Sequence, residues 1–348
     1  MDAVTLEVTR IVAGGDGMAR DPEGRVTFVE GALPGETVRA DLREQRRDFA
    51  KATTTEVLVP SAHRTTPPCP FVAAGCGGCD WQHITPAGQR RLKAEIVADA
   101  LRRQARVDVP IELGPELAAT GYRTTIRGVA TDGRFGLRHR RSHDVVTVGP
   151  CLVAHPLLDE LINVGRFPDG EVILRAGGAT GERLAIVAGG PDGPSDALDL
   201  PADVRVVTEG QLRSGRRAWH HEELAGRRWR ISARSFFQAR PDGAEALVAA
   251  VADALDGALA PGSHLVDLYG GVGLFAGGVL AGAGAGAAAD ARVTVVESGA
   301  SSVADARVNL ADLDARILKG DVATWRPARA DAVIASGPER PALRRADG

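Results

Sequence analysis

The sequence lacks the features that mark a membrane-spanning or exported protein. None of its 348 residues lies in a stretch of about 18 uninterrupted apolar residues, the length that predicts a membrane span. The Ala- and Gly-rich run 276–291 is too weakly apolar to predict one. At the start, MDAVTLEVTR has no basic region followed by an apolar run, so no signal peptide is predicted. We therefore expect a cytoplasmic protein that has no membrane partner and acts as a monomer.

The sequence also lacks a strong excess of charge of either sign. It is 44% hydrophobic and 25% charged, with a net charge of −3, which is ordinary for a globular protein. The positive charges are nevertheless unevenly spread. Between Gly121 and His143 six arginines stand against one acid, Asp132: Arg123, Arg127, Arg134, Arg138, Arg140 and Arg141. Residues 86–106 hold a second cluster, Arg90, Arg91, Lys93, Arg102, Arg103 and Arg106, against Glu95 and Asp99. Such clusters can contact phosphates, although a solvated basic face is the commoner explanation of a single charge run.

Changes of pattern along the chain predict three domains in a multidomain α/β fold. Residues 1–60 contain short Val- and Thr-rich segments, VTLEVTRIV, RVTFVEGAL, ETVRADLRE and FAKATTTEVLV, separated by turn residues, which favours a small OB-like β-barrel. A β-rich central domain, 61–235, begins with a linker and an amphipathic helix over 86–106, and is strand-like from residue 110 onward. From 236 to 348 strands alternate with helices, which predicts a parallel, Rossmann-like sheet.

The sequence has few cysteines: Cys69, Cys76, Cys79 and Cys151. The first three lie in CPFVAAGCGGCDWQH, and the last lies in VGPCLVAHP. Two cysteines separated by two residues can hold one ion or one edge of a cluster, and the intervening glycines relieve crowding. Four thiolates suit either a structural zinc or a [4Fe–4S] cluster, whereas a disulfide is disfavoured in a cytosolic chain. The spacing alone leaves zinc and iron–sulfur both open.

A glycine-rich turn, VDLYGGVGLFAG, directly follows a predicted strand and contains Gly270, Gly271 and Gly273. Such a turn lets the backbone approach a cofactor, with the start of the next helix nearby. Glu297 ends the next predicted strand, where an acid typically hydrogen-bonds ribose hydroxyls. The pattern indicates a nucleotide-containing cofactor, although NAD enzymes use similar geometry and a tight packing turn is the structural alternative.

In this order, CPFVAAGCGGCDWQH, SFFQAR and VDLYGGVGLF resemble the bacterial TRAM-containing 23S rRNA (uracil-C5) methyltransferases, and the segments VTRIVAGGDGMAR and FVEGALPGETV resemble their TRAM domain. The resemblance extends to about Ala335. It implies a [4Fe–4S] cluster, rather than zinc, on the four cysteines, S-adenosylmethionine (SAM) as the cofactor and RNA as the partner. The implied cofactor contacts are Gln238, Asp267, Tyr269, Gly271, Gly273, Glu297 and Asp321.

The resemblance also implies a reaction. In the family a cysteine thiolate adds to C6 of uracil, C5 then takes the methyl group, and a carboxylate base removes the C5 proton. The target base must leave its stack to be reached.

This sequence departs from the family near its end. Ser336 and Gly337 stand where the family has the Asp of an Asp-Pro-Pro-Arg-like motif, and the four cysteines are already assigned to the cluster. The resemblance therefore implies no catalytic residue, and we expect a catalytic domain that is truncated. Two functions follow: an RNA (uracil-C5) methyltransferase by descent, and an inactive relative that binds RNA and a [4Fe–4S] cluster. Methylation of a more nucleophilic atom would need no cysteine, but CGGC and FFQ argue against it.

Overall fold

The computed structural model describes residues 3–255, 258–282, 290–326 and 329–337. The chain divides into two compact units. The first comprises 1–114 and 138–146, and the second comprises 115–137 and 147–348. Among the described residues, no helix is both long enough and apolar enough to cross a membrane.

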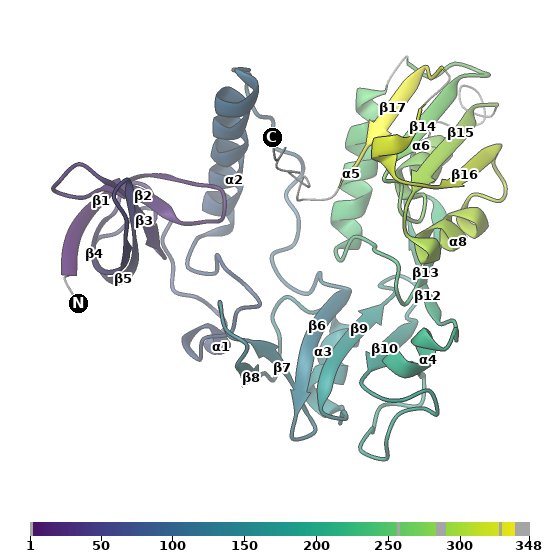
Figure 1. Cartoon of the computed structure of the whole chain (residues 1–348), viewed down its shortest axis with the longest axis horizontal. Helices are drawn as coiled ribbons and strands as arrows, with labels where there is room; N and C mark the ends of the chain where they lie inside the picture. Colours follow the sequence, from purple (N-terminus) through teal and green to yellow (C-terminus); the bar gives the residue numbers. More distant parts are fainter. Residues whose placement is uncertain (1–2, 256–257, 283–289, 327–328, 338–348) are drawn as a thin grey trace. The chain divides into compact units, whose positions relative to one another are not determined.

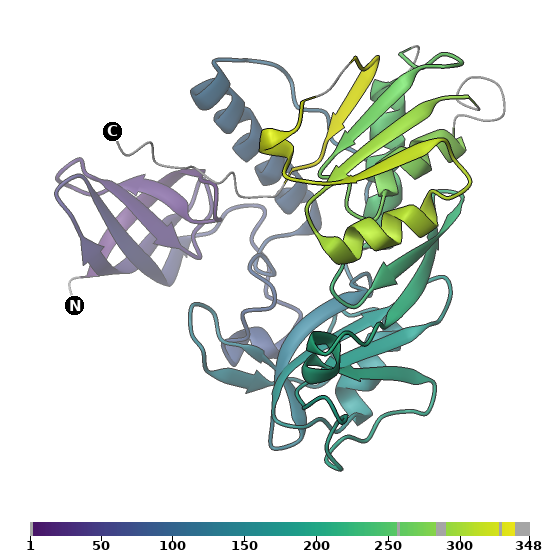
Figure 2. The same ribbon diagram turned by 45° about the vertical axis from the view of Figure 1, so that its right-hand side comes forward.

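In the first unit, five strands close into a barrel (Figure 2). They are β1 (Ala3–Ile11), β2 (Gly17–Arg20), β3 (Val26–Glu30), β4 (Thr37–Gln45) and β5 (Phe49–Val59), in the order β1-β2-β3-β5-β4. The β3–β5 pair is parallel, and the other printed pairs are antiparallel. The predicted N-terminal barrel is therefore confirmed.

Strand β2 is absent from the sequence prediction, which contained four strands for this region. Its segment, Gly-Met-Ala-Arg, follows a Gly-rich turn and is too short to show an alternating pattern. A side chain at Gly17 would place its Cβ 2.8 Å from Val8 Cγ1 and 2.9 Å from the Ala32 carbonyl oxygen, so the strand depends on a glycine at this position. The barrel interior is filled by alternate residues of the strands, among them Leu6, Val29 and Val38.

Two helices complete the described part of the first unit, α1 (Pro70–Ala73) and α2 (Pro86–Ala100). Helix α2 continues as a π-helical turn, Leu101–Ala105, so the predicted helix over 86–106 is confirmed. The Thr85 hydroxyl caps its start by accepting a hydrogen bond from the Gly88 N–H. Leu92 is buried in a small cluster with Ile11 and Ile84.

A six-stranded sheet forms the first part of the second unit, in the order β11-β10-β9-β6-β7-β8. Its strands are β6 (Thr125–Thr131), β7 (Arg134–Arg138), β8 (Val145–Thr147), β9 (Gly170–Ala176), β10 (Arg183–Val187) and β11 (Val204–Thr208). The tip of the β7–β8 hairpin, 138–146, belongs to the first unit.

Two helices interrupt this strand-rich region, and the sequence prediction missed both. Helix α3 (Pro156–Val164) begins with proline after His155, whose side chain caps it, and buries Leu158, Leu161 and Ile162 at helical spacing. Helix α4 (Glu209–Arg213) begins with a capping box formed by Thr208 and Gln211. Both are short, so the surrounding Val-rich strands dominated the pattern.

The rest of the second unit contains a two-stranded hairpin and a parallel sheet (Figure 1). The hairpin pairs β12 (Trp219–Leu224) with β13 (Arg227–Ser232). The following elements are α5 (Pro241–Ala254), β14 (His264–Leu268), α6 (Leu274–Gly282), β15 (Arg292–Glu297), α8 (Ala300–Asn309), β16 (Ala315–Lys319), the 3-10 turn η2 (Val322–Thr324) and β17 (Ala332–Ala335). The strands are ordered β16-β15-β14-β17, and every neighbouring pair is parallel. The predicted alternation of strands and helices is confirmed. The last segment, 338–348, where we expect the catalytic domain to be truncated, lies outside the described residues.

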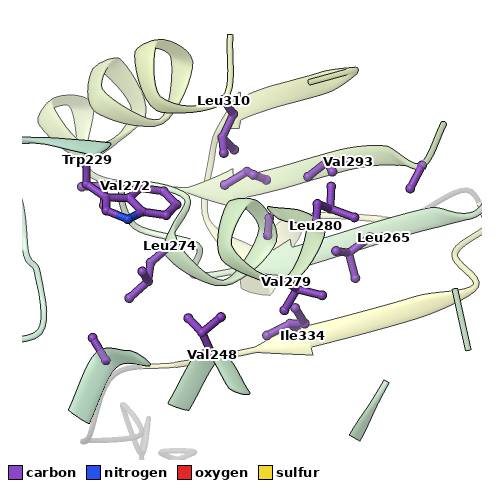
Figure 3. Packing of buried hydrophobic residues seen from close by; sticks show 14 of the residues in the cluster. Trp229, Val248, Leu265, Val272, Leu274, Val279, Leu280, Val293, Leu310 and Ile334 are labelled. Carbon is purple, nitrogen blue, oxygen red and sulfur yellow. The ribbon is translucent and has the colours of Figure 1, made fainter. Parts of the chain in front are cut away.

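One apolar core joins the hairpin to the parallel sheet. Figure 3 shows Trp229 of β13 beside Val272 and Leu274, at the start of α6. The Trp229 indole is fully buried, and its Nε1–H donates to the Leu224 carbonyl at 3.0 Å. A Cβ at Gly277 of α6 would lie 2.7 Å from this ring. The hairpin is therefore packed as a part of the C-terminal sheet's own core.

Candidate functional site

The carboxyl ends of the four parallel strands lie at one edge of the C-terminal sheet, where α/β proteins bind their ligands. Three backbone hydrogen bonds hold the residues that follow these strands against their neighbours. Gly270 donates to Val296 at 3.3 Å, Gly320 donates to Glu297 at 3.0 Å, and Ser336 donates to Leu268 at 3.2 Å. The predicted contacts Tyr269, Glu297 and Asp321 are therefore brought to the same edge.

The glycine-rich turn after β14 has three residues in the left-handed region. Tyr269 has φ = 58°, Gly271 has φ = 57° and Gly273 has φ = 91°. A Cβ at Gly270 would lie 2.6 Å from Val295 Cγ1, whereas one at Gly271 would meet no atom within 4 Å. The turn is thus packed against the sheet on one side and open on the other. Tyr269 is a non-glycine residue held in a costly conformation, which is typical of ligand-binding turns.

The Glu297 carboxylate holds this edge together. Its Oε2 accepts from the Gly271 N–H at 3.1 Å, and its Oε1 accepts from the Gly299 N–H at 2.6 Å. The side chain thereby links the glycine-rich turn to the start of α8. An acid in this position can also accept hydrogen bonds from ribose hydroxyls.

Asp267 is a fully buried carboxyl below the same turn. Its Oδ2 accepts a hydrogen bond from the Ala276 N–H at 3.2 Å, while its Oδ1 has no partner among the described residues. The pKa of Asp267 is raised to about 7, chiefly by burial and also by the nearby Glu297 carboxylate, while the Ala276 hydrogen bond opposes the rise. A buried acid with an unpartnered oxygen and a raised pKa is a mark of a functional site.

The remaining predicted contacts are less engaged with this edge. Gln238 is half-exposed in the loop between β13 and α5. Asp321 is exposed, and its Oδ1 accepts from the Ala323 N–H at 2.9 Å, so it already caps the turn η2. The sequence prediction did not single out Phe236, whose side chain is 72% exposed beside Gln238. The signal was present in the SFFQ motif, where two aromatic residues occur together outside any strand.

A buried carboxylate of α8 fixes the segment that leads into this loop. Asp305 accepts from Arg230 Nε at 2.7 Å, from the Ser232 N–H at 2.8 Å, and from the Ser235 hydroxyl at 2.6 Å. The Asn309 side chain adds a further hydrogen bond by accepting from the Arg230 N–H at 2.8 Å. The end of β13 and the start of the SFFQ segment are therefore bonded to α8.

The CGGC loop in the first unit needs a glycine at position 77. A Cβ at Gly77 would lie 2.9 Å from the Arg138 carbonyl oxygen and from the Arg140 nitrogen, both backbone atoms of the β7–β8 hairpin tip. The Gly78 N–H is 3.5 Å from the Cys76 Sγ and donates to it. Burial raises the pKa of the Cys76 thiol, the Gly78 hydrogen bond opposes this, and the Cys79 and Cys69 thiols raise it further. Since the thiolates repel one another, a bound cation would favour their ionisation.

Cys76 and Cys79 line a cavity of about 410 Å³ in the first unit. His83 also lines it, and burial, helped by Arg64 and Arg140, lowers the pKa of this imidazole to about 4. Among the described residues, no three His, Cys, Asp or Glu side chains are gathered closely enough to hold a metal ion. The prediction that the four sulfurs converge is therefore not confirmed. Three of the cysteines belong to the first unit, whereas Cys151 belongs to the second, where its N–H donates to Asp159 at 2.7 Å.

The predicted basic clusters are partly neutralised by acids within the first unit. Arg141 pairs with Glu30 at 3.0 Å, and Arg91 of α2 pairs with Glu95 at 2.9 Å. These contacts favour the interpretation of a solvated face for those arginines. In the second unit, Arg127 and Arg134 are exposed, and no hydrogen bond or ion pair is found for their guanidinium groups among the described residues.

Taken together, the parallel sheet, its glycine-rich turn and the acid that ends β15 define a Rossmann-like fold. A family model described as TRAM domain matches residues 3–55, which form most of the barrel. An uncharacterized RNA methyltransferase of Streptomyces coelicolor is 36% identical, covering 92% of this chain and 74% of that protein. A second, from Streptomyces avermitilis, is 38% identical, covering 78% of this chain and 68% of that protein. The chain therefore belongs to the family of TRAM-domain RNA methyltransferases.

Two further comparisons concern a relative with a named activity and a solved structure with a similar fold. The 23S rRNA (uracil(1939)-C(5))-methyltransferase RlmD of Halomonas elongata is 40% identical over 164 residues, which is 45% of this chain and 33% of that protein. The structure of the Pyrococcus abyssi tRNA (uracil-54, C5)-methyltransferase in complex with S-adenosyl-L-homocysteine matches with a TM-score of 0.63 at 19% identity, covering 94% of this chain and 82% of that one. At this identity the likeness shows a shared fold alone.

The raised pKa of Asp267 predicts a pH-dependent stability. The unfolded carboxyl ionises near its ordinary value of 3.8, whereas the folded one ionises at about 7. Between these values only the folded state holds the proton, so the free energy of unfolding falls as the pH rises from about 4 to about 7, by on the order of 1–4 kcal/mol. The substitution Asp267→Asn removes this loss while keeping an oxygen for the Ala276 N–H. We expect its melting temperature to exceed that of the unaltered protein by more at pH 8 than at pH 5.

Thermal unfolding without added ligand measures this difference. Asp314→Asn is a matched control, because Asp314 is exposed at the opposite edge of the same sheet. A difference between Asp267→Asn and the unaltered protein that stays constant with pH would contradict the assignment.

Proposed function

We propose that this chain is a SAM-dependent RNA methyltransferase whose family reaction is methylation of uridine C5, with 23S ribosomal RNA as the expected substrate. The glycine-rich turn and Glu297 at the carboxyl edge of the parallel sheet, above the buried Asp267, carry the proposal. Membership in the RNA methyltransferase family supplies the reaction class. The names of its uracil-C5 relatives supply the target atom.

The residues at this edge fit the proposed cofactor. A Cβ at Gly271 would meet no atom within 4 Å, so the space beside this residue is open to a ligand. The Asp267 Oδ1 has no partner among the described residues. We assign SAM binding to Gln238, Asp267, Tyr269, Gly271, Gly273, Glu297 and, more peripherally, Asp321. Within this set Glu297 would orient the ribose, and the exposed Tyr269 ring would pack against the cofactor. When bound, SAM supplies an electrophilic methyl group on its sulfonium.

The barrel is suited to RNA. Phe28 and Phe49 form an edge-to-face pair with ring centroids 6.1 Å apart, and the Lys51 ammonium lies 5.8 Å from the Phe49 ring. Half-exposed aromatic rings beside positive charge can stack on bases and contact phosphates. The barrel and the exposed arginines of 121–143 are thus proposed to bind the RNA.

The cysteines are proposed to hold a [4Fe–4S] cluster. Cys69, Cys76, Cys79 and Cys151 are four thiol ligands, the number that a cubane cluster takes. The cavity that Cys76 and Cys79 line supports a bound group at these two thiols. The preference for iron–sulfur over zinc rests on the family resemblance.

A second candidate function is binding of RNA and a [4Fe–4S] cluster without methyl transfer. The assignment of all four thiols to the cluster favours it. The C5 reaction needs a thiolate at C6, yet each cysteine of the sequence is a proposed cluster ligand. At the position of the family's Asp stands Ser336, whose hydroxyl lies 3.5 Å from the Tyr269 carbonyl oxygen. No catalytic residue is therefore assigned within these 348 residues.

Cofactor binding is tested by calorimetric titration with S-adenosylhomocysteine. Replacing Glu297 by Ala removes the proposed hydrogen-bond acceptor for the ribose. Hydrogen bonds to a charged group contribute about 1.5–3 kcal/mol, so we expect a Kd that is roughly 10- to 100-fold higher. Asp314→Ala removes a carboxylate from the other edge of the same sheet and should bind like the unaltered protein. Equal affinity of the Glu297 variant and the unaltered protein, with both folded, would show that the pocket is assigned wrongly.

Cluster binding is tested by metal analysis of anaerobically purified protein. We expect a brown protein with about four irons and four sulfides per chain, as a cubane requires. Cys76→Ser should lower the iron content because the cluster loses a ligand. Stoichiometric zinc without iron would overturn the iron–sulfur assignment.

Methyl transfer separates the two candidate functions. The test is incubation with labelled SAM and unmodified 23S rRNA, followed by mass spectrometry of the nucleosides. For the 348-residue polypeptide we expect RNA and cofactor binding without 5-methyluridine, because loss of a covalent nucleophile usually costs several orders of magnitude in rate. If 5-methyluridine formed, one cysteine would have to be the nucleophile. Loss of 5-methyluridine formation in the Cys151→Ser variant would identify Cys151 as that cysteine.

A further inference from the structure

A second cavity, of about 330 Å³, lies in the second unit between the segment 212–219, the end of β13 and the start of α8. Small side chains, including Ala218, Ala233 and Ala304, are among the residues that line it. None of its lining residues belongs to the glycine-rich turn or to the residues that we assign to SAM. The hydrogen bonds from Arg230, Ser232 and Ser235 to Asp305 fix its walls. The cavity is therefore a built feature at a place to which no ligand has been assigned.

The cavity carries an excess of positive charge. Four arginines line it, Arg216, Arg217, Arg230 and Arg234, and no carboxylate is found among its lining residues in the described part of the chain. Arg230 is neutralised by Asp305, and Arg234 lies 3.5 Å from Glu209. Arg216 and Arg217 are exposed, and neither guanidinium has a hydrogen bond or ion pair among the described residues. Two positive charges are thus left available to an anion.

An aromatic ring stands beside these charges. The Trp219 ring lies 5.5 Å from the Arg230 guanidinium and 5.8 Å from that of Arg205. The cation–π contacts hold the indole in place at the cavity wall while leaving it half-exposed. A half-exposed indole beside arginines can stack on a base whose phosphate the arginines bind.

The start of α8 supplies neutral donors to the same cavity. Ala300 and Ser301, in the first turn, line it, and Gly299 provides no side-chain cap. The Gly299 N–H is already bonded to Glu297, but the N–H groups of a first helical turn favour an anion. The Ser301 hydroxyl accepts from the Ser235 hydroxyl at 3.0 Å and keeps its own proton to donate to an anion. The guanidinium pair, the hydroxyl and the helix start together suit the tetrahedral oxygens of a phosphate.

We propose that this cavity is a phosphate subsite that holds one backbone phosphodiester of the RNA substrate, with a neighbouring base against Trp219. The inference rests on the proposed function, since it takes RNA as the substrate. A continuous strand suits the site better than a free phosphate, because the exposed Arg205 and Arg213 extend the positive charge beyond the cavity. The subsite would anchor the RNA on the methyltransferase unit itself, apart from the barrel.

The experiment measures binding of a fluorescein-labelled single-stranded RNA to the full chain by anisotropy at several salt concentrations. We expect Arg216→Gln/Arg217→Gln to weaken binding about tenfold near 100 mM salt and to flatten the slope of log K against log salt by about 1.4, the value for two lost contacts with single-stranded RNA. Ala304→Glu, which places a carboxylate in the cavity, should weaken binding at least as much.

Two matched controls separate the cavity from general charge. Arg307→Gln/Arg316→Gln removes two exposed arginines of the same unit outside the cavity, and Val308→Glu adds a carboxylate to an exposed position of α8. Both should bind RNA like the unaltered protein. Circular dichroism and melting temperatures establish that all variants are folded.

The outcomes are distinct. Equal RNA affinity of the unaltered chain and both cavity variants would overturn the subsite while leaving the proposed function in place. Failure of the unaltered chain to bind RNA would overturn both. Binding of adenosine monophosphate or inorganic phosphate that both cavity variants abolish, with RNA binding insensitive to the same variants, would assign the cavity to a free phosphate compound and overturn the RNA assignment.

Discussion

The buried carboxylate of Asp305 holds together several elements of the second unit. It receives hydrogen bonds from a guanidinium, a backbone N–H and serine hydroxyls, so the cost of burying its charge is offset by several short contacts. One helical turn later, Asn309 bonds both backbone groups of Arg230 and also donates to the Val272 carbonyl in the glycine-rich turn at 3.0 Å. Through these two side chains the β12–β13 hairpin, α8 and the cofactor turn form one hydrogen-bonded assembly.

This assembly fixes the positions of the SFFQ segment and of the start of α8. The SFFQ segment begins at Ser235, which is bonded to Asp305, so Phe236 and Gln238 extend from a fixed point. Glu297 fixes the start of α8 from the opposite direction by binding the Gly299 N–H. The proposed cofactor edge and the arginine-lined cavity therefore share α8 as a common wall. A distortion of this helix would disturb both sites at once.

Much of this arrangement could be predicted from the sequence, because local patterns report local structure. The Gly270–Gly273 turn, the acid at the end of β15 and the helix over 86–105 each carry their signal within a few residues. Strand β2 and helices α3 and α4 were missed because they are too short for periodicity to distinguish them. Asp305 was also missed, since its partners are about 70 residues away and no spacing rule connects them. The relation between Cys151 and the other three cysteines is a long-range property of the same kind, which no local motif specifies.

The β7–β8 hairpin determines how proteolysis or truncation would affect the two units. Strand β7 starts in the second unit and β8 ends there, while the hairpin tip supplies the Arg138 and Arg140 backbone against which Gly77 is packed in the first unit. The polypeptide thus passes between the two units three times, after residues 114, 137 and 146. A protease that cut the first connection alone would release 1–114 as a separate polypeptide, held only by non-covalent contacts with the hairpin tip of its own unit. Neither unit is a contiguous segment that could be expressed by simple trimming, and the cysteine loop would lose its backing if the barrel were produced without the hairpin tip.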